Sequence, residues 1–283
     1  MKSKLKYISS MLIFGSVGLF VRYIPLDVAQ IAWARGIIGC CFLLAMLFFI
    51  REKMSWRRLR PDIWVLLASG AAIGINWIFL FLSYNHTSIA NATICYYLAP
   101  VIVVFLSPFL LKEKLSGAKV CCILAALLGI VLMTGFPGRG TNDLLGIIYG
   151  LLAALFYATV IILNKYIRHA TDFERTVFQL AFTVAALGPY VLIATPPPAA
   201  IDARAIALLL VLGVVHTGFA YYLYFSGLHA LKAQTAALLS YIDPLTAIIL
   251  STLILHEQMT VWQIVGGVLI LGAAYFSVTP QRG

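Results

Sequence analysis

One apolar segment occurs twice in this chain, and a proline interrupts each copy. Residues 88–116 read SIANATICYYLAPVIVVFLSPFLLKEKLS, and residues 232–260 read KAQTAALLSYIDPLTAIILSTLILHEQMT. With Pro100 set on Pro244, the copies align without a gap and pair several further residues: Tyr97 with Tyr241, Ser107 with Ser251 and Glu113 with Glu257. Each copy is long enough to cross a bilayer as a helix. A duplicated, proline-interrupted span is typical of the binding site of a secondary transporter.

The composition excludes an ordinary water-soluble domain. Hydrophobic residues make up 62% of the chain and charged residues 11%, so there is too little polar surface to cover a soluble core. The net charge of +10 does not indicate nucleic acid, because the basic residues lie in short runs between apolar segments. The five cysteines lie in apolar segments without CxxC spacing, so we interpret them as packing residues and expect no metal or cofactor.

The hydropathy pattern predicts an all-α membrane protein with ten transmembrane helices. The expected spans are 7–24, 29–50, 62–83, 88–111, 117–135, 144–164, 174–194, 205–226, 233–255 and 261–278. The repeat also pairs Arg22 with Lys165 and His86 with His229, so each half has five spans. We therefore predict two repeats, 1–140 and 141–283. Because five is odd, the second repeat enters the membrane from the opposite side, which gives the inverted halves that alternating access requires.

The basic residues predict the orientation. Sixteen Lys and Arg residues fall on the side that holds the N-terminus and three on the other side, while Arg35 lies within a span. Positively charged loops stay in the cytoplasm, so both termini are expected there.

The repeated motif resembles the EamA-type repeat of the drug/metabolite transporter superfamily. The resemblance rests on YYLAP at 96–100 with Glu113 and Ser116, and on YIDP at 241–244 with Glu257 and Thr260. Arg35 in WARGIIG is similar to an arginine that the family often has in its second span. The resemblance covers both repeats and implies ten helices, the bacterial inner membrane, and export of metabolites, often with proton coupling. It leaves the substrate open among amino acids, amines, nucleobases, sugars and drugs.

The two prolines are candidate hinges of a central cavity. Pro100 and Pro244 each remove a backbone donor, so the carbonyls of Tyr96 and Ser240 need another partner, either substrate, water or a neighbouring side chain. A structural kink is the alternative interpretation.

Three ionisable residues inside spans are candidates for coupling or charge recognition, because charge in a membrane is costly. Asp243 could contact a substrate amine or carry a coupling proton, or it could pair with Arg35 or Lys165. Arg35 could bind a substrate carboxylate bidentately, or pair with Asp243. His216 could relay protons, or bridge two helices as a neutral hydrogen-bonded side chain.

Neutral polar and aromatic residues complete the predicted substrate-binding set, of which we expect about half to contact the cavity. Its members are Trp33, Asn76, Trp77, Asn91, Tyr97, Tyr157, Asn164, Tyr222, Gln234 and Tyr241.

The sequence favours a secondary transporter that exports a small polar or zwitterionic metabolite such as an amino acid or an amine. No GxxxxGK[ST] loop, HExxH or GxSxG motif indicates ATP hydrolysis or another enzymatic activity. Two alternatives stay open: an importer of organic cations or quaternary amines, and a flippase for lipids or lipid-linked sugars. The expected partners are the substrate, protons and membrane lipid, with a homodimer through Gly129, Gly266 and Gly272 as a further alternative.

Overall fold

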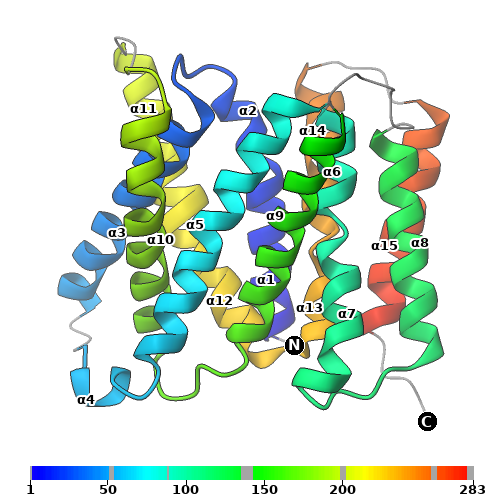
Figure 1. Cartoon of the computed structure of the whole chain (residues 1–283), viewed down its shortest axis with the longest axis horizontal. Helices are drawn as coiled ribbons and strands as arrows, with labels where there is room; N and C mark the ends of the chain where they lie inside the picture. The colour runs from blue at the N-terminus through cyan, green and yellow to red at the C-terminus, as the bar shows by residue number, and fades with distance from the viewer. Residues whose placement is uncertain are drawn as a thin grey trace.

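The computed structural model describes residues 2–50, 54–87, 89–134, 143–197, 202–255 and 260–278, and the secondary structure of these residues is entirely helical (Figure 1). The first-half helices are α1 (Lys2–Gly15), α2 (Val17–Val21), α3 (Val28–Ile50), α4 (Trp56–Leu59), α5 (Ile63–His86), α6 (Ile89–Tyr96), α7 (Ala99–Leu110) and α8 (Gly117–Thr134). The second-half helices are α9 (Asp143–Leu163), α10 (Asp172–Ala194), α11 (Ala203–Val211), the π-helical segment η1 (Leu212–Phe219), α12 (Ala220–Ala230), α13 (Ala233–Leu239), α14 (Ile242–Leu255) and α15 (Val261–Val278).

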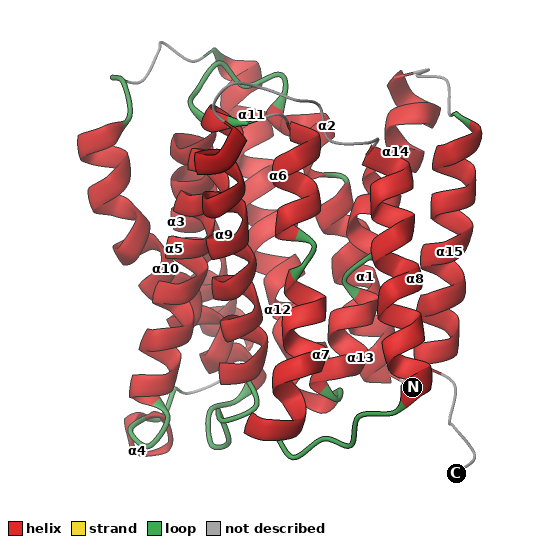
Figure 2. Cartoon of the chain, turned by 45° about the vertical axis from the view of Figure 1, so that its right-hand side comes forward, coloured by secondary structure: helices red, strands yellow, loops and turns green. Residues whose placement is uncertain are grey.

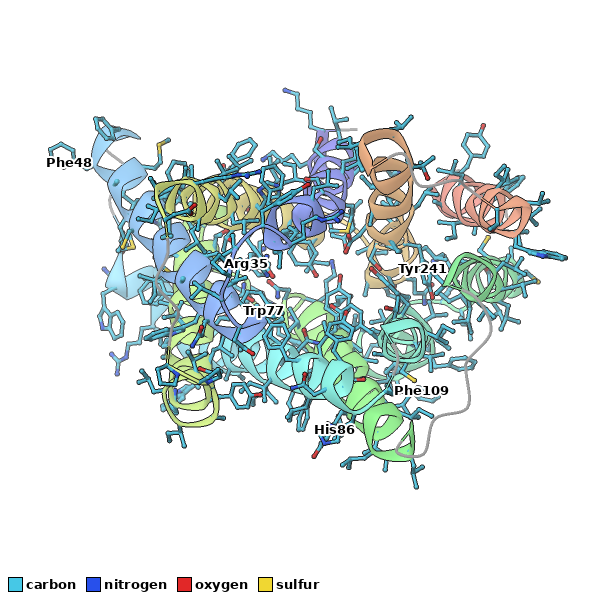
Figure 3. All side chains as sticks on the ribbon, turned by 90° about the horizontal axis from the view of Figure 1, so that it is seen from above. Arg35, Phe48, Trp77, His86, Phe109 and Tyr241 are labelled. Carbon is cyan, nitrogen blue, oxygen red and sulfur yellow. The ribbon has the colours of Figure 1, made fainter. Side chains whose placement is uncertain are left out.

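Eight segments of the described chain are long and apolar enough to span a membrane, and two shorter apolar helices, Gly117–Leu132 and Ile264–Phe276, pack beside them. The outward surface is apolar: Phe48, Phe109 and Ile193 are more than four-fifths exposed, and Figure 3 shows Phe48 and Phe109 pointing away from the bundle. Such a surface is stable only in lipid. The N-terminus of α1 and the last turn of α15 lie at the same end of the bundle (Figure 1).

Both copies of the repeated segment are interrupted at the same position. The first copy forms α6 and α7 with a break at Tyr97–Leu98, and the second forms α13 and α14 with a break at Ser240–Tyr241. Figure 2 shows the first break as a stretch of loop between α6 and α7. Pro100 falls in the first turn of α7, where a backbone N–H would have no helical partner in any case. Each proline therefore starts a second helix within the span instead of bending one continuous helix.

Small residues bring the helices around these breaks into close contact. A Cβ on Gly15 would lie 2.6 Å from both the carbonyl oxygen of Asp243 and the Cβ of Thr246, so α1 crosses directly over α14. A Cβ on Gly213 would lie 2.3 Å from Ile38 Cγ2, which places η1 directly on α3.

The α8–α15 pair depends on the same kind of contact. A Cβ on Gly129 would lie 2.7 Å from the carbonyl oxygen of Gly266 in the same chain. These two glycines therefore pack α8 on α15 within the chain, and the homodimer through them stays a prediction. Gly272 has open space around its Cα.

Candidate functional site

A cavity of about 530 Å³ lies at the level of the two helix breaks. The lining residues of α1 and α3 come from the half of each helix that is farther from the N-terminal end of the bundle (Figure 1). Those of α5 lie between its middle and its far end, and those of α6 lie next to the break. The lining residues that carry a polar side-chain atom are Arg35, Asn76, Trp77, Tyr84, Thr93, Tyr96, Tyr97, Tyr157, Tyr221, Tyr224 and Asp243. Met11, Phe14, Val17, Ile73, Leu80, Val160, Pro244 and Ala247 complete the wall. Beneath it, the fully buried side chains of Tyr7, Phe225 and Leu228 fill the interior.

The two breaks contact one another through equivalent tyrosines. The hydroxyl of Tyr241 donates a 2.9 Å hydrogen bond to the carbonyl oxygen of Tyr97, and the two rings lie 6.0 Å apart between centroids. A carbonyl at the end of α6 is thereby satisfied by a side chain from the other repeat, as buried backbone groups require.

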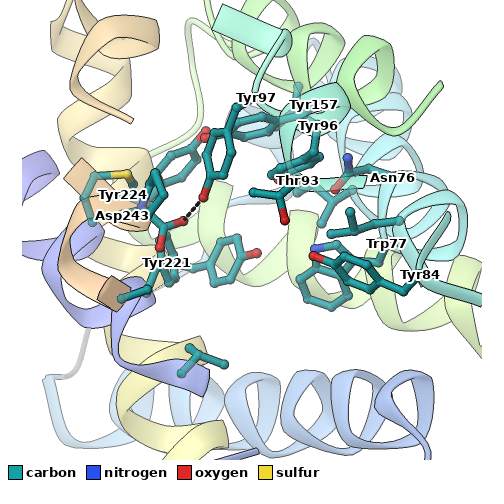
Figure 4. A pocket seen from close by; sticks show the side chains of 18 of the residues that line it. Asn76, Trp77, Tyr84, Thr93, Tyr96, Tyr97, Tyr157, Tyr221, Tyr224 and Asp243 are labelled. Carbon is teal, nitrogen blue, oxygen red and sulfur yellow. Dashed lines mark hydrogen bonds between the residues drawn. The ribbon is translucent and has the colours of Figure 1, made fainter. Parts of the chain in front are cut away.

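Asp243 stands in the first turn of α14 and faces the cavity. The Tyr97 hydroxyl lies 3.5 Å from its Oδ2 atom, at the outer limit of a hydrogen bond (Figure 4). The ion pairs of the described residues, Arg58–Glu174 and His169–Asp62, do not include Asp243. The expected alternatives of a pair with Arg35 or Lys165 are therefore not formed. The carboxyl group adjoins the positive end of the α14 dipole.

Arg35 carries the opposite charge on another wall of the same cavity. Its guanidinium carbon lies 4.8 Å from the centroid of the Trp77 ring, which is a cation–π distance. Its Nε atom is buried and has no hydrogen-bond partner among the described residues. One cation and one anion thus face a common space without pairing with each other.

Aromatic rings form most of the wall between these two charges. Figure 4 shows Tyr96, Tyr97 and Tyr157 together on one side and Trp77 with Tyr84 on another. The rings of Tyr96 and Tyr157 stack with centroids 5.5 Å apart. Tyr84 and Tyr96 were not predicted. Tyr84 could have been found, because Trp77, Leu80 and Tyr84 repeat at helical spacing on one face of α5.

The predicted site residues divide into those that line the cavity and those that do not. Arg35, Asn76, Trp77, Tyr97, Tyr157, Asp243 and Pro244 line it. The amide nitrogen of Asn76 already donates a 2.6 Å hydrogen bond to the carbonyl oxygen of Ala153. The side chain of Asn91 lies outside the described residues.

Four predicted substrate contacts lie away from the cavity and bind other parts of the protein. Trp33 Nε1 donates to the Val184 carbonyl at 3.1 Å. Asn164 exchanges two 3.0 Å hydrogen bonds with Gln179. Gln234 accepts from Lys119 Nζ and donates to Ser107 Oγ, each at 2.6 Å. The Tyr222 ring packs on Phe173, since it is turned away from the face that carries Tyr221 and Tyr224.

The remaining predictions also fall outside the lining. Tyr241 is fully buried behind Tyr97, and Pro100 is buried at the start of α7. His216 lies in η1, where its Nε2 is 2.9 Å from the Ser16 hydroxyl at the junction of α1 and α2. This histidine therefore bridges two helices. The described residues contain no cluster of three or more side chains suited to hold a metal ion.

Comparison with known proteins identifies the family. The model of the EamA-like transporter family matches residues 3–135 and again residues 144–279. The chain belongs to the EamA-like transporter family.

Several relatives carry transporter names. The chain is 32% identical to the uncharacterized transporter YxxF of Bacillus subtilis (strain 168), with 99% of this chain and 90% of that one covered. An uncharacterized transporter of Archaeoglobus fulgidus is 30% identical, with 93% and 91% covered. Protein PecM of Dickeya dadantii (strain 3937) is 29% identical over 75% of this chain and 72% of that protein. These matches and the apolar helices make the chain a multi-pass membrane transporter with a duplicated EamA unit.

The fold of this EamA-like chain is similar to that of a protein with a known crystal structure. The two superpose with a TM-score of 0.82 over 98% of this chain and 97% of the other, at 19% sequence identity.

Proposed function

We propose that this EamA-like protein is a secondary transporter that moves a small zwitterionic metabolite outward by alternating access. The observation that carries the proposal is the pair of opposite charges, Arg35 and Asp243, which face one cavity from different walls without neutralising each other. Leaving two charges unpaired inside a membrane protein is costly, so their retention favours a ligand that supplies both partners.

A zwitterion fits both charges at once. Its carboxylate would accept two parallel N–H bonds from Arg35, and its ammonium group would bind Asp243 beside the Tyr97 hydroxyl. The aromatic rings between them offer apolar area and cation–π contact. A volume of about 530 Å³ lies within the range of small-molecule sites.

The helix pattern supports alternating access. If the two shorter helices α8 and α15 cross the membrane with the eight long spans of the described residues, the chain has ten crossings, five in each of the proposed halves 1–140 and 141–283. In Figure 1, α6–α7 and α13–α14 run in opposite directions along the bundle, as inverted repeats require. Together with the basic-residue count, this supports an inner-membrane protein with both termini in the cytoplasm.

Asp243 is also the residue that we assign to proton coupling. Among the lining residues it is the only carboxyl group, and a carboxyl group at this depth binds either a proton or a cation. The Asp243 carboxyl group would then bind a proton that enters from one side of the membrane and, in turn, the amine of a substrate that enters from the other side.

The test is a counterflow measurement in proteoliposomes with matched triplets of compounds. Each triplet contains a zwitterionic amino acid, the amine that lacks its carboxylate, and the acid that lacks its amine. We expect the zwitterion to be exchanged at least about tenfold faster than either analogue, since each analogue leaves one buried charge unpaired. Equal exchange of the amine would favour the organic-cation importer. Exchange of lipid alone would favour the flippase.

A further inference from the structure

The turn between α12 and α13 is held from both sides at the end of the bundle that carries the N-terminus. Lys165 Nζ donates hydrogen bonds to the carbonyl oxygens of Leu228 and Leu231, at the end of α12. Glu113 accepts from the backbone N–H of Ala233 at 2.7 Å and from that of Gln234 at 3.3 Å, at the start of α13. The last carbonyls of a helix attract a cation and its first N–H groups attract an anion, so both side chains match the helix end that they bind.

This turn carries the floor of the cavity. Tyr224 lines the cavity from α12, and Phe225 and Leu228 lie buried beneath it. Ala233 and Ala236 continue the same buried layer into α13. These buried residues of α12 and α13 close the cavity toward the N-terminal end of the bundle. A passage to that end therefore requires α12 and α13 to move away from the helices that they pack against. Lys165 binds that turn from the segment after α9 and Glu113 binds it from the segment after α7, so they oppose its movement.

The duplication places a second cation at the opposite end. Arg22 aligns with Lys165, and since His86 aligns with His229, Asn85 at the end of α5 aligns with Leu228. Arg22 is exposed, and its guanidinium carbon lies 5.5 Å from the ring centroid of its neighbour Tyr23. Among the described residues, no hydrogen bond or ion pair joins the Arg22 side chain to α5. Of these two equivalent cations, Lys165 thus binds the end of α12, whereas Arg22 does not bind the end of α5.

We infer that Lys165 and Arg22 are positioning residues that alternate. Lys165 holds the end of α12 while the cavity faces away from the cytoplasm, and Arg22 holds the carbonyl end of α5 around Asn85 while the cavity faces the cytoplasm. This inference rests on the proposed alternating-access function. Beyond that function, we assign the side chains that close each end of the cavity and the helix termini that they bind.

The test measures which side of the membrane reaches the cavity. In a background in which the five native cysteines are replaced, Thr93→Cys places a thiol on the cavity wall. A membrane-impermeant maleimide is added to the cytoplasmic face of inside-out vesicles. We expect slow labelling with Lys165 present, and labelling about tenfold faster or more in Lys165→Met, since charge-assisted bonds to two carbonyls are lost. Lys165→Arg, which keeps the charge and the donors, restores slow labelling.

The role of Arg22 is tested in the Lys165→Met background. Adding Arg22→Ala removes the contact that stabilises the cytoplasm-facing state, so labelling from the cytoplasmic side falls back toward the slow rate. Arg204→Ala is the matched control. The guanidinium carbon of Arg204 lies 5.1 Å from the centroid of the same Tyr23 ring, but Arg204 is not the residue that aligns with Lys165. This control leaves the fast labelling of Lys165→Met unchanged.

Two results would overturn the inference. In one, Lys165→Met labels at the same rate as the background. In the other, Arg22→Ala and Arg204→Ala act alike on Lys165→Met. Because labelling needs no substrate, failure of the proposed function is seen separately, as a wild-type protein that exchanges none of the compound triplets.

Discussion

At the scale of single residues, the proposed substrate recognition and proton coupling both depend on the charge of Asp243. We expect Asp243→Asn to abolish pH-gradient-driven transport in proteoliposomes and to leave the fold intact, because the amide has the same shape but neither binds a proton nor neutralises an amine. Asp27→Asn, on the segment before α3 and outside the cavity lining, is the matched control. Unchanged proton dependence in Asp243→Asn would remove this residue from coupling.

We expect the equivalent tyrosines to have different roles: Tyr241 stabilises the fold and Tyr97 contributes to substrate affinity. Tyr241→Phe leaves the Tyr97 carbonyl without its 2.9 Å donor, which should lower the free energy of unfolding by about 1–3 kcal/mol. Tyr97→Phe removes only a 3.5 Å contact to Asp243, so it should change substrate affinity more than stability. Thermal unfolding of both purified variants in detergent makes the comparison. Equal losses of stability would contradict it.

Lys165 gives a pH dependence whose sign follows from its burial. It lies beyond the span that ends at Leu163, and burial lowers its pKa from 10.5 to about 8, with Arg175 adding to the decrease and Glu113 opposing it. The folded protein therefore loses this proton at a lower pH than the unfolded chain does. The cost of burying the ammonium group falls as the pH rises from about 8 toward 10.5, and the neutral amine still has two donors for the two carbonyls.

Wild-type protein should therefore gain stability relative to Lys165→Met when the pH is raised from 7 to 9.5. The difference in unfolding temperature between the two proteins at each pH is the measurement. A difference that stays constant over this range would show that Lys165 keeps its ordinary pKa in the folded protein.

Two predicted substrate contacts, Asn164 and Gln234, show what a sequence leaves open at the residue scale. Each carries an amide within a predicted span, where an amide needs a partner. The structure supplies those partners from Gln179, Lys119 and Ser107. A sequence indicates that a buried amide needs hydrogen-bond partners, but it does not show whether the protein or a ligand provides them. Arg35 and Asp243 were found because ionisable residues within spans are rare, and that signal does not depend on knowing the neighbours.

At the scale of the elements, the crossing of α1 over α14 holds the second break in place. Gly15→Val would place new atoms against the Asp243 carbonyl and the Thr246 side chain, both 2.6 Å from a Cβ. Overpacking of this kind costs about 1–3 kcal/mol or more. Gly18→Val is the control, because nothing lies within 4 Å of its Cβ position. Unfolding temperatures of the two variants in detergent should differ clearly. Similar values would contradict the crossing.

The broken spans could be predicted from the sequence because proline marks them, whereas two other irregular elements could not. The break between α1 and α2 falls at Ser16, which no proline precedes and whose hydroxyl binds the Ile13 carbonyl. The π-helical turn of η1 is stabilised by hydrogen bonds such as that from the Thr217 hydroxyl to Leu212. Both lie at close contacts with other helices, the α1–α2 break beside α14 and η1 against α3, and tertiary contacts of this kind leave no periodic pattern in the sequence.

At the scale of the whole molecule, the proposed function depends on two halves that we infer to be threaded through the membrane in opposite senses. The sequence repeat, the two family matches and the opposite directions of α6–α7 and α13–α14 all agree with this arrangement. Inverted repeats let one chain form two similar structures, each closed at a different end, about one central cavity.

Site-directed labelling at equivalent positions of the two repeats tests this arrangement most directly. Lys114 and Gln258 each follow the glutamate of the repeated motif by one residue. Each is replaced by cysteine in the cysteine-free background and exposed to an impermeant maleimide on one face of sealed vesicles at a time. We predict that Lys114→Cys is labelled only from the cytoplasmic face and Gln258→Cys only from the opposite face. Labelling of both positions from the same face would contradict it.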